Sequence, residues 1–245
     1  MQYSDDILRS NLKELKLHYT ADNLEKMLAS LDQKNSREML SHLVTLETTE
    51  RHSRSIARRM NEARIGRFKR MEDFNWSHPT EINRNSIEGL FKSDITTAGK
   101  NLIIIGTQGL GKTMIARNLA SLAVYQGHTV RFITASRLVA ELLSAGHRIE
   151  SRLRYYANVE LLVIDELGYL SYQDRAADML YEIVSRRYEK APIILTSNLA
   201  FKEWPTIFPG AACLSAILDR LIHHCEILHI TGDSYRKTEA KGKAK

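Results

Sequence analysis

The segment from Gly106 to Thr113 constrains the fold of this chain more than any other. It reads G-T-Q-G-L-G-K-T and stands directly between an apolar run at 102–105 and a helix-forming stretch at 113–126. Glycines spaced in this way let backbone N–H groups converge on phosphate oxygens, where a Cβ atom would obstruct the approach. The helix that follows adds the positive end of its dipole. The pattern therefore predicts a phosphate-binding loop that joins a buried strand to a helix.

The residue types of this loop indicate which contacts a nucleotide would make. Lys112 would reach the β- and γ-phosphates with its ammonium group, and Thr113 would ligate Mg²⁺ through its hydroxyl. The alternative is a plain glycine-rich turn before a helix, but the spacing of Lys112 and Thr113 after the glycines favours a nucleotide. The predicted nucleotide-binding residues are Gly106, Thr107, Gln108, Gly109, Leu110, Gly111, Lys112, Thr113 and Met114.

Further apolar runs recur along the rest of the chain. They lie at 130–133, 161–164, 193–195 and 227–230, and stretches long enough to form helices separate them. Continuous apolar strands that alternate with helices are typical of a parallel sheet covered by helices on both faces. We therefore expect an α/β fold with a five-stranded parallel sheet flanked by helices.

Polar residues follow two of these strands. Asp165 and Glu166 come directly after the run 161–164, and Asn198 ends the segment ILTSN. The carboxyl ends of parallel strands meet at one edge of the sheet, beside the predicted phosphate loop. Asp165 would hold Mg²⁺, Glu166 would polarise an attacking water, and Asn198 would orient that water or sense the γ-phosphate. A helix-capping acid and a polar turn residue are the alternatives, but the ordered set favours a hydrolytic site.

The N-terminal part of the chain has a different character. Residues 1–65 contain no glycine and no proline, and their apolar residues recur at helical spacing, which predicts an all-helical domain. The predicted organisation is a helical N-terminal domain over 1–66, a linker and lead-in segment over 67–100, a nucleotide-binding domain over 101–236 and a disordered basic tail over 237–245.

Basic residues are concentrated in one segment of the chain. Residues 51–72 hold eight Lys or Arg against two acids, in a protein whose total net charge is +6. Such clustering points toward an anionic partner. Arg51, Arg54, Arg58 and Arg59 fall on one helical face, where they could follow DNA phosphates without reading sequence. A solvated, charged helix face is the alternative.

Composition excludes several other classes. No apolar run is long enough to span a bilayer, and the N-terminus opens with acids and lacks an apolar signal core. We therefore expect a cytoplasmic protein with no membrane partner. Cys213 and Cys225 are too few for a disulfide framework or a zinc site by themselves, which favours a reducing compartment.

The ordered set of phosphate loop, acidic strand end and polar strand end resembles the AAA+ ATPases. Within that class, nearly the whole chain is similar to the IstB-type helper ATPases of bacterial insertion sequences. Helicase loaders of the DnaC type share the ATPase core less closely, and initiators of the DnaA type more distantly. The segments that carry the resemblance are IDELGYL (164–170), SRRYE (185–189), LTSN (195–198), ILDRLIHHCEILHI (217–230) and GDSYR (232–236).

The resemblance implies that ATP is the nucleotide and that a homo-oligomer forms its active sites between subunits. It makes Arg220 the arginine finger for a neighbour's γ-phosphate, whereas a solvated charge or an ion pair with Asp219 is the alternative. Arg236 lies at the position where the resemblance would place a second sensor residue. The chain ends nine residues later, too soon for the usual helical lid domain, which leaves that role open.

The resemblance makes a second basic segment a candidate for DNA contact. Arg148, Arg152 and Arg154 lie between the second and third predicted strands, where the initiator-related group carries an extra helix that faces the nucleic acid. A solvated charged segment is again the alternative.

The implied function is that of a bacterial, DNA-stimulated ATPase that acts as a molecular switch. It would assemble on double-stranded DNA through mostly non-specific backbone contacts, become nucleoid-associated there, and assist a cognate transposase in target selection and transposition. A replicative helicase loader of the DnaC type is the alternative within the class. A small-molecule kinase would need an acceptor pocket and an arginine-bearing lid, and neither is evident. Intact Lys112, Thr113, Asp165 and Glu166 disfavour a structural DNA-binding protein with a vestigial nucleotide site.

Overall fold

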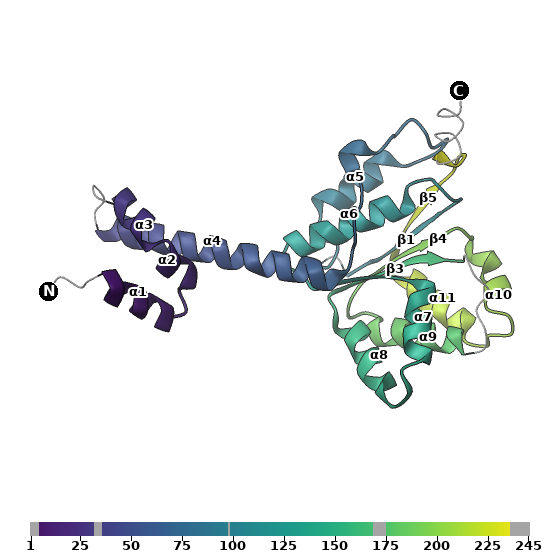
Figure 1. Cartoon of the computed structure of the whole chain (residues 1–245). Coiled ribbons are helices and arrows are strands. Elements are labelled where there is room, and N and C mark those ends of the chain that lie inside the picture. The colour runs from purple at the N-terminus through teal and green to yellow at the C-terminus, as the bar shows by residue number, and fades with distance from the viewer. Residues whose placement is uncertain (1–4, 32–35, 98, 169–174, 236–245) are drawn as a thin grey trace, which may run out of the picture. The chain divides into compact units, whose positions relative to one another are not determined.

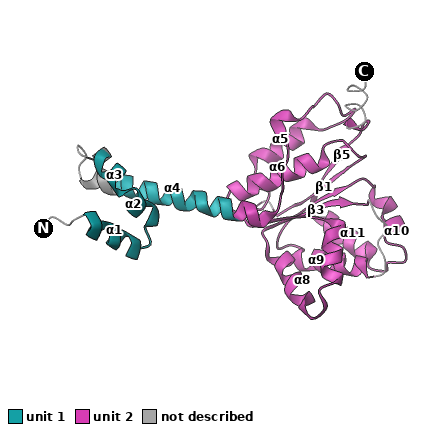
Figure 2. Ribbon diagram, viewed as in Figure 1, with its two compact units in different colours: residues 1–58 teal, residues 59–245 magenta. Residues whose placement is uncertain are grey.

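The computed structural model divides into two compact units, Met1–Arg58 and Arg59–Lys245 (Figures 1 and 2). Within the described part of the chain, no helix combines the length and the apolar character that crossing a membrane requires. The structure describes residues 5–31, 36–97, 99–168 and 175–235. The predicted tail and Arg236 lie outside these residues.

The first unit is entirely helical in its described residues, which confirms the predicted character of the N-terminal segment. Leu24 and Met27 form its buried apolar centre, and side chains from the helices on either side, among them Leu12 and Leu43, pack against them. Its helices are α1 (Asp5–Glu14), α2 (His18–Asp22), α3 (Leu24–Leu31) and α4 (Ser36–Ala63), the last of which continues into the second unit.

A buried carboxylate ties α2 to α4 within the first unit. Glu47 is only 5% exposed, and its Oε2 accepts hydrogen bonds from the Thr20 amide at 3.3 Å and the Thr20 hydroxyl at 3.1 Å. Its other oxygen accepts from Arg51 Nε at 3.0 Å. Burial alone would raise the pKa of Glu47, but the hydrogen bonds from Arg51 and Thr20 outweigh it and lower that pKa.

The second unit is built on a five-stranded sheet in the order β2-β3-β4-β1-β5, and every neighbouring pair is parallel. This confirms the predicted α/β fold. Because β1 lies between β4 and β5, the segment that leaves its carboxyl end is flanked by a strand on each side, at the carboxyl ends of the strands, where parallel sheets bind ligands. The strands are β1 (Asn101–Gly106), β2 (Val130–Thr134), β3 (Leu161–Leu167), β4 (Ile193–Ser197) and β5 (Cys225–Ile230).

Helices cover both faces of this sheet, as continuous apolar strands require. Helices α5 and α6 lie on one face, and α7, α8, α9 and α11 lie on the other (Figure 1). Their bounds are α5 (Arg84–Lys92), α6 (Lys112–Tyr125), α7 (Ala135–Leu143), α8 (Ile149–Asn158), α9 (Ala176–Arg187), α10 (Trp204–Ile207) and α11 (Leu214–His223). Short 3-10 turns are η1 (Met71–Asp73), η2 (Gly146–Arg148) and η3 (Phe201–Glu203).

The segment 67–100, interpreted from sequence as linker and lead-in, holds η1 and α5. It is tied to the chain that follows β5. The Thr80 amide donates to the Thr231 carbonyl at 2.9 Å, and His78 Nε2 lies 2.8 Å from the Asp233 carbonyl oxygen. The compact units divide between Arg58 and Arg59, and the domain bounds drawn from sequence stay a prediction.

Candidate nucleotide-binding site

The loop between β1 and α6 has the conformation that its glycines predict. Gly109 and Gly111 adopt φ values of 81° and 87°, in the left-handed region that glycine enters without strain. There is also no room for a side chain. A Cβ on Gly109 would stand 2.3 Å from the Ser234 hydroxyl, and one on Gly111 would stand 2.4 Å from the Phe74 ring.

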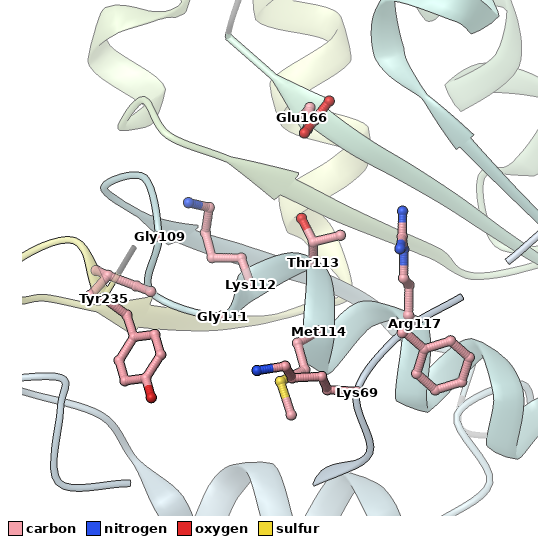
Figure 3. A pocket seen from close by; sticks show the side chains of 11 residues that line it. Lys69, Gly109, Gly111, Lys112, Thr113, Met114, Arg117, Glu166 and Tyr235 are labelled. Atoms are coloured by element: carbon pink, nitrogen blue, oxygen red, sulfur yellow. The ribbon is translucent and has the colours of Figure 1, made fainter. Parts of the chain in front are cut away.

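Lys112 is the first residue of α6 and is buried, with 5% of its surface exposed. Its ammonium group donates to the carbonyls of Gly106 at 2.6 Å and Thr107 at 2.7 Å. The charge therefore lies within the curve of the loop, at the amino end of a helix, where an anion is doubly favoured. Figure 3 shows Lys112 and Thr113 on the same side of the pocket as this loop.

Asp165 is held by two hydroxyls at the carboxyl end of β3. Its Oδ1 accepts from Thr113 at 3.0 Å and from Thr196 at 2.5 Å, and the residue is 1% exposed. The structure thus brings together the two side chains predicted to hold Mg²⁺. Sequence analysis missed Thr196, whose position in the buried strand β4 was visible but whose partner was not.

Glu166 is turned away from its neighbour by a bulge in β3. The register between β3 and β4 shifts between Ile164 and Leu167, and Glu166 adopts a φ of 65°. Its amide donates to Thr196 Oγ1 at 3.0 Å, while its side chain is exposed and lines the pocket (Figure 3). Bulges of this kind redirect side chains beside active sites. Asp165 and Glu166 can therefore take different roles although they are adjacent.

Asn198 directly follows β4, as predicted. Its Oδ1 is buried and has no hydrogen-bond partner among the described residues. It packs against Gly168, where a Cβ would stand 2.6 Å from that oxygen. A buried acceptor without a partner is costly, so this oxygen is suited to accept a hydrogen bond from a bound water or ligand.

The phosphate loop, the start of α6 and Glu166 line a cavity of about 350 Å³, whereas Asp165 and Asn198 are not among its lining residues. An adjoining cavity of about 120 Å³ has Phe74, Pro79 and Tyr235 among its walls, which suits an aromatic base. Sequence analysis missed the lead-in residues because it treated that segment as a connection. Beyond the loop itself, the larger cavity is lined by Phe68, Lys69, Met114, Arg117, Glu166 and Tyr235.

The segment that follows β5 is hydrogen-bonded to the phosphate loop. The Tyr235 amide donates to the Gly109 carbonyl at 3.2 Å, and the Thr107 hydroxyl donates to the Gly232 carbonyl at 3.1 Å. Thr107 therefore supports the loop through its side chain, and its predicted contact with the nucleotide stays a prediction. The motif GDSYR carried this signal, but its role depends on contacts far along the chain.

Arg220 lies near the amino end of β1, whereas the phosphate loop follows the carboxyl end of that strand. The next residue, Leu221, accepts through its carbonyl from Asn101 Nδ2 at 3.0 Å, and Asn101 begins β1 whereas Gly106 ends it. The strand between them spans about 16 Å. The guanidinium lies over the Tyr181 ring, 5.0 Å from its centroid. The structure therefore does not bring Arg220 to the phosphate loop of its own chain.

The basic residues predicted to contact DNA differ in how they are engaged. On α4, Arg51 binds Glu47 and the Lys16 carbonyl, and Arg54 pairs with Glu50 at 2.7 Å. Arg58 is exposed, whereas Arg59 is half-buried and begins the second unit.

The second basic segment lies on η2 and α8. Arg148 and Arg152 are exposed, while Arg154 pairs with Glu150 at 3.0 Å. Arg186 also binds Glu150, and the hydrogen bonds from Arg186 and Arg154 lower the pKa of Glu150 to about 2.

The fold and this site define a P-loop nucleotide-binding protein of the AAA+ class. The family profile described as IstB-like ATP binding protein matches residues 10–243, and the chain belongs to this family. The chain is 36% identical over 238 residues to the "Insertion sequence IS21 putative ATP-binding protein" of Pseudomonas aeruginosa, covering 96% of this chain and 89% of the relative. It is 34% identical over 206 residues to the "Insertion sequence IS5376 putative ATP-binding protein" of Geobacillus stearothermophilus, covering 83% and 82%.

Solved structures share the fold at low sequence identity. A crystal structure of DnaI superposes with a TM-score of 0.57 at 20% identity, covering 69% of this chain and 91% of that chain. AMPPCP-bound DnaA from Aquifex aeolicus gives 0.52 at 21% identity, covering 70% and 56%. Both the family and the AAA+ fold predicted from sequence are thereby confirmed.

Proposed function

We propose that this protein is a Mg²⁺-dependent ATPase whose hydrolysis uses Glu166 as the general base. The observation that carries the proposal is the difference in environment between the two acids at the end of β3. Asp165 is buried and hydrogen-bonded to Thr113, whereas Glu166 is turned into the cavity that Lys112 enters. These different environments support a role for Asp165 at the metal ion and for Glu166 at the attacking water.

The residues present fit a magnesium ion. Thr113 offers a hydroxyl oxygen and Asp165 a carboxylate, and such hard oxygen ligands are the ones that Mg²⁺ prefers. When bound there, Mg²⁺ would neutralise charge on the β- and γ-phosphates. Lys112 would turn from the loop carbonyls to the same phosphates, and Asn198 Oδ1 would accept a hydrogen bond from the attacking water.

Replacing Glu166 by Gln tests the assignment of the base. The amide keeps the size of the side chain but cannot accept a proton, so we expect ATP to bind normally while turnover falls by about 10²–10⁴. Binding is measured with a fluorescent ATP analogue and turnover by phosphate release. Glu88→Gln, on the exposed face of α5, is the matched control and keeps both activities. Hydrolysis at the normal rate by Glu166→Gln would remove Glu166 from this role.

We propose further that the active site is completed by a second copy of the chain. Arg220 lies near the start of β1, far from Lys112 of its own chain, which supports a role at a neighbour's nucleotide. Arginine fingers are worth about 10³–10⁵ in rate. Arg220→Ala and Lys112→Ala should each be inactive alone, but their mixture should regain part of the activity. No recovery in oligomers shown to contain both variants would make Arg220 a structural residue.

The names of the relatives support a role on DNA. Both are ATP-binding proteins of bacterial insertion sequences. We therefore propose that the protein assembles with ATP on double-stranded DNA in the bacterial cytoplasm and assists the transposase of such an element. The basic residues Arg54, Arg58, Arg148 and Arg152 would contact phosphates. Affinity capture from cells should recover the element's transposase, whereas recovery of a replicative helicase would favour a loader instead.

A further inference from the structure

Two histidines and a glutamate lie together on the second unit, away from the nucleotide pocket. His223 ends α11, His224 directly precedes β5, and Glu189 lies in the turn between α9 and β4. Glu189 Oε1 is 4.0 Å from His223 Nδ1 and 3.8 Å from His224 Nε2. One ligand atom from each residue lies within 4.8 Å of the other two, and all three residues are exposed.

The backbone that carries these residues is fixed by Asn101, at the start of β1. Its amide N–H donates to the His224 carbonyl at 2.7 Å, and its side-chain Nδ2 donates to the Leu221 carbonyl at 3.0 Å. Its Oδ1 accepts from the Ile193 amide at 2.9 Å. Asn101 thus joins the start of β4 to the segment that contains His224.

A buried arginine secures the turn on its other side. Arg187 is 1% exposed, and its guanidinium donates to the Pro192 carbonyl at 2.7 Å and to the Val159 carbonyl at 2.7 Å. Its own carbonyl accepts from the Lys190 amide at 2.9 Å. Glu189 therefore projects from a short turn anchored at both ends, with little freedom for its backbone to move away from the histidines.

The residue types match one class of ligand. Two imidazole nitrogens and one carboxylate oxygen form a common protein ligand set for Zn²⁺, with a water in the fourth position. At metal–ligand distances of about 2.0–2.1 Å, neighbouring ligands of a tetrahedral ion stand about 3.3 Å apart. The observed separations of 3.8 and 4.0 Å are about 0.5–0.7 Å longer than this tetrahedral spacing, and all three ligand atoms lie within 4.8 Å of one another, so rotations of the exposed side chains must bring them together.

We propose that Glu189, His223 and His224 form a binding site for a divalent transition-metal ion of the Zn²⁺ type. The Tyr188 hydroxyl lies 2.8 Å from the same His223 Nδ1, and this hydrogen bond would give way when that nitrogen binds the ion. Cys225 is not part of the site, because its Sγ donates to the Glu226 carbonyl at 3.2 Å. Binding would join the end of α11 to the turn after α9. His223, at that end of α11, lies three residues beyond Arg220.

The test uses the full-length, untagged protein, freed of metal with a chelator and without nucleotide. Zn²⁺ titrated by calorimetry at about pH 7.5, where free imidazole is mostly neutral, should bind at one site per chain that the double variant His223→Ala/His224→Ala lacks. The double variant should weaken that binding at least about tenfold. Co²⁺ should give the wild type, but not the double variant, the intense visible absorption of a tetrahedral complex.

Controls separate this site from other metal-binding groups. His147→Ala removes an exposed histidine outside the cluster and should leave both signals unchanged. Glu189→Gln keeps the side chain's size and should also weaken Zn²⁺ binding, which settles the matter if the double variant fails to fold. Zn²⁺ affinity and Co²⁺ absorption unchanged in Glu189→Gln and in a folded double variant would overturn the proposal. Because no ATP is used, the result is independent of the proposed ATPase activity.

Discussion

The two compact units use polar residues in opposite ways. In the first, Leu24 and Met27 are the centre of a small apolar cluster, and the buried carboxylate of Glu47 holds two helices together. In the second, an extensive apolar core surrounds the sheet, buried Lys112 lines a cavity, and buried Asp165 bonds to Thr113, which lines the same cavity. A large core can hold charged and strained residues for chemistry, whereas a small one needs its polar contacts for folding.

Lys112→Ala tests the second unit and should have the largest effect. The variant loses charge-assisted contacts to phosphate, each worth about 1.5–3 kcal/mol, so we expect ATP affinity to fall by about 100-fold or more. Binding is followed with a fluorescent ATP analogue. Lys26→Ala, on the exposed side of α3, is the control. If Lys112→Ala bound ATP like the wild type, the cavity beside the loop would not be the phosphate site.

Glu47→Ala tests the first unit and should lower its free energy of unfolding by about 1–3 kcal/mol, because it leaves the buried Thr20 groups unpaired. Hydrogen exchange should speed up in α2 and α4 and stay unchanged in β3. Because the pKa of Glu47 is lowered in the folded state, its contribution is present above its unfolded pKa and is lost as the pH falls through the folded one.

The control for this prediction is Glu50→Ala, one helical turn further along α4. Glu50 pairs with Arg54 near the surface, and such pairs contribute about 0–1 kcal/mol. Equal effects of the two substitutions would show that the buried hydrogen bonds of Glu47 contribute no more than a surface pair and that the contrast between the units is wrong.

Arg54→Ala with Arg58→Ala tests whether the first unit contacts DNA. The two residues stand one helical turn apart, so both could follow the same phosphate backbone. We expect a several-fold loss of affinity that is equal for all DNA sequences, and a log-log salt slope flatter by about 0.9 per lost phosphate contact. Lys13→Ala with Lys26→Ala is the charge-matched control. A salt slope equal to the wild type's would make these arginines a solvated face.

Substitution of His128 should have the smallest effect. It tests a polar contact that contributes to folding in the second unit. His128 lies between Asp94 Oδ2 at 2.8 Å and Glu160 Oε1 at 3.0 Å. Partial burial lowers the pKa of His128, but Glu160 and Asp94 outweigh it and raise that pKa. Its contribution to stability is therefore complete below its unfolded pKa, at about pH 6.5, and is lost as the pH rises through the folded pKa.

The melting temperature measures this effect of His128. The difference between the wild type and His128→Gln should be larger at pH 6 than at pH 9, and His147→Gln should show no such pH dependence. A difference that stayed constant between the two pH values would mean that His128 acts through packing alone.

Local pattern accounts for what the sequence predicted well. The five strands follow from continuous apolar runs, and the glycines, Lys112 and Thr113 follow from a motif that is contiguous in the chain. The adjacency of Asp165 to Thr113 could be inferred because parallel strands end at a common edge. Each of these inferences depends only on neighbouring residues or on the direction of strands.

The parts that sequence analysis missed depend on packing between distant segments. Thr196 bonds to Asp165 only because β3 and β4 are in a particular register, and that register shifts at the bulge. Tyr235 reaches the Gly109 carbonyl from 126 residues away, and Phe74 fills the space beside Gly111. A segment with few periodic residues, such as the lead-in, gives no pattern from which such contacts could be read.

The left-handed backbone at Glu166 has a consequence for how this chain can change over generations. A residue with a side chain costs about 1–2 kcal/mol in that conformation, whereas glycine adopts it freely and asparagine with less strain. Folding and the proposed role of Glu166 as the base therefore favour different residues at this one position. A lineage released from selection for ATP turnover should drift there toward glycine or asparagine, and Glu166→Gly or Glu166→Asn should be tolerated by the fold in a thermal melt. At this position the backbone favours glycine, whereas the proposed base requires glutamate.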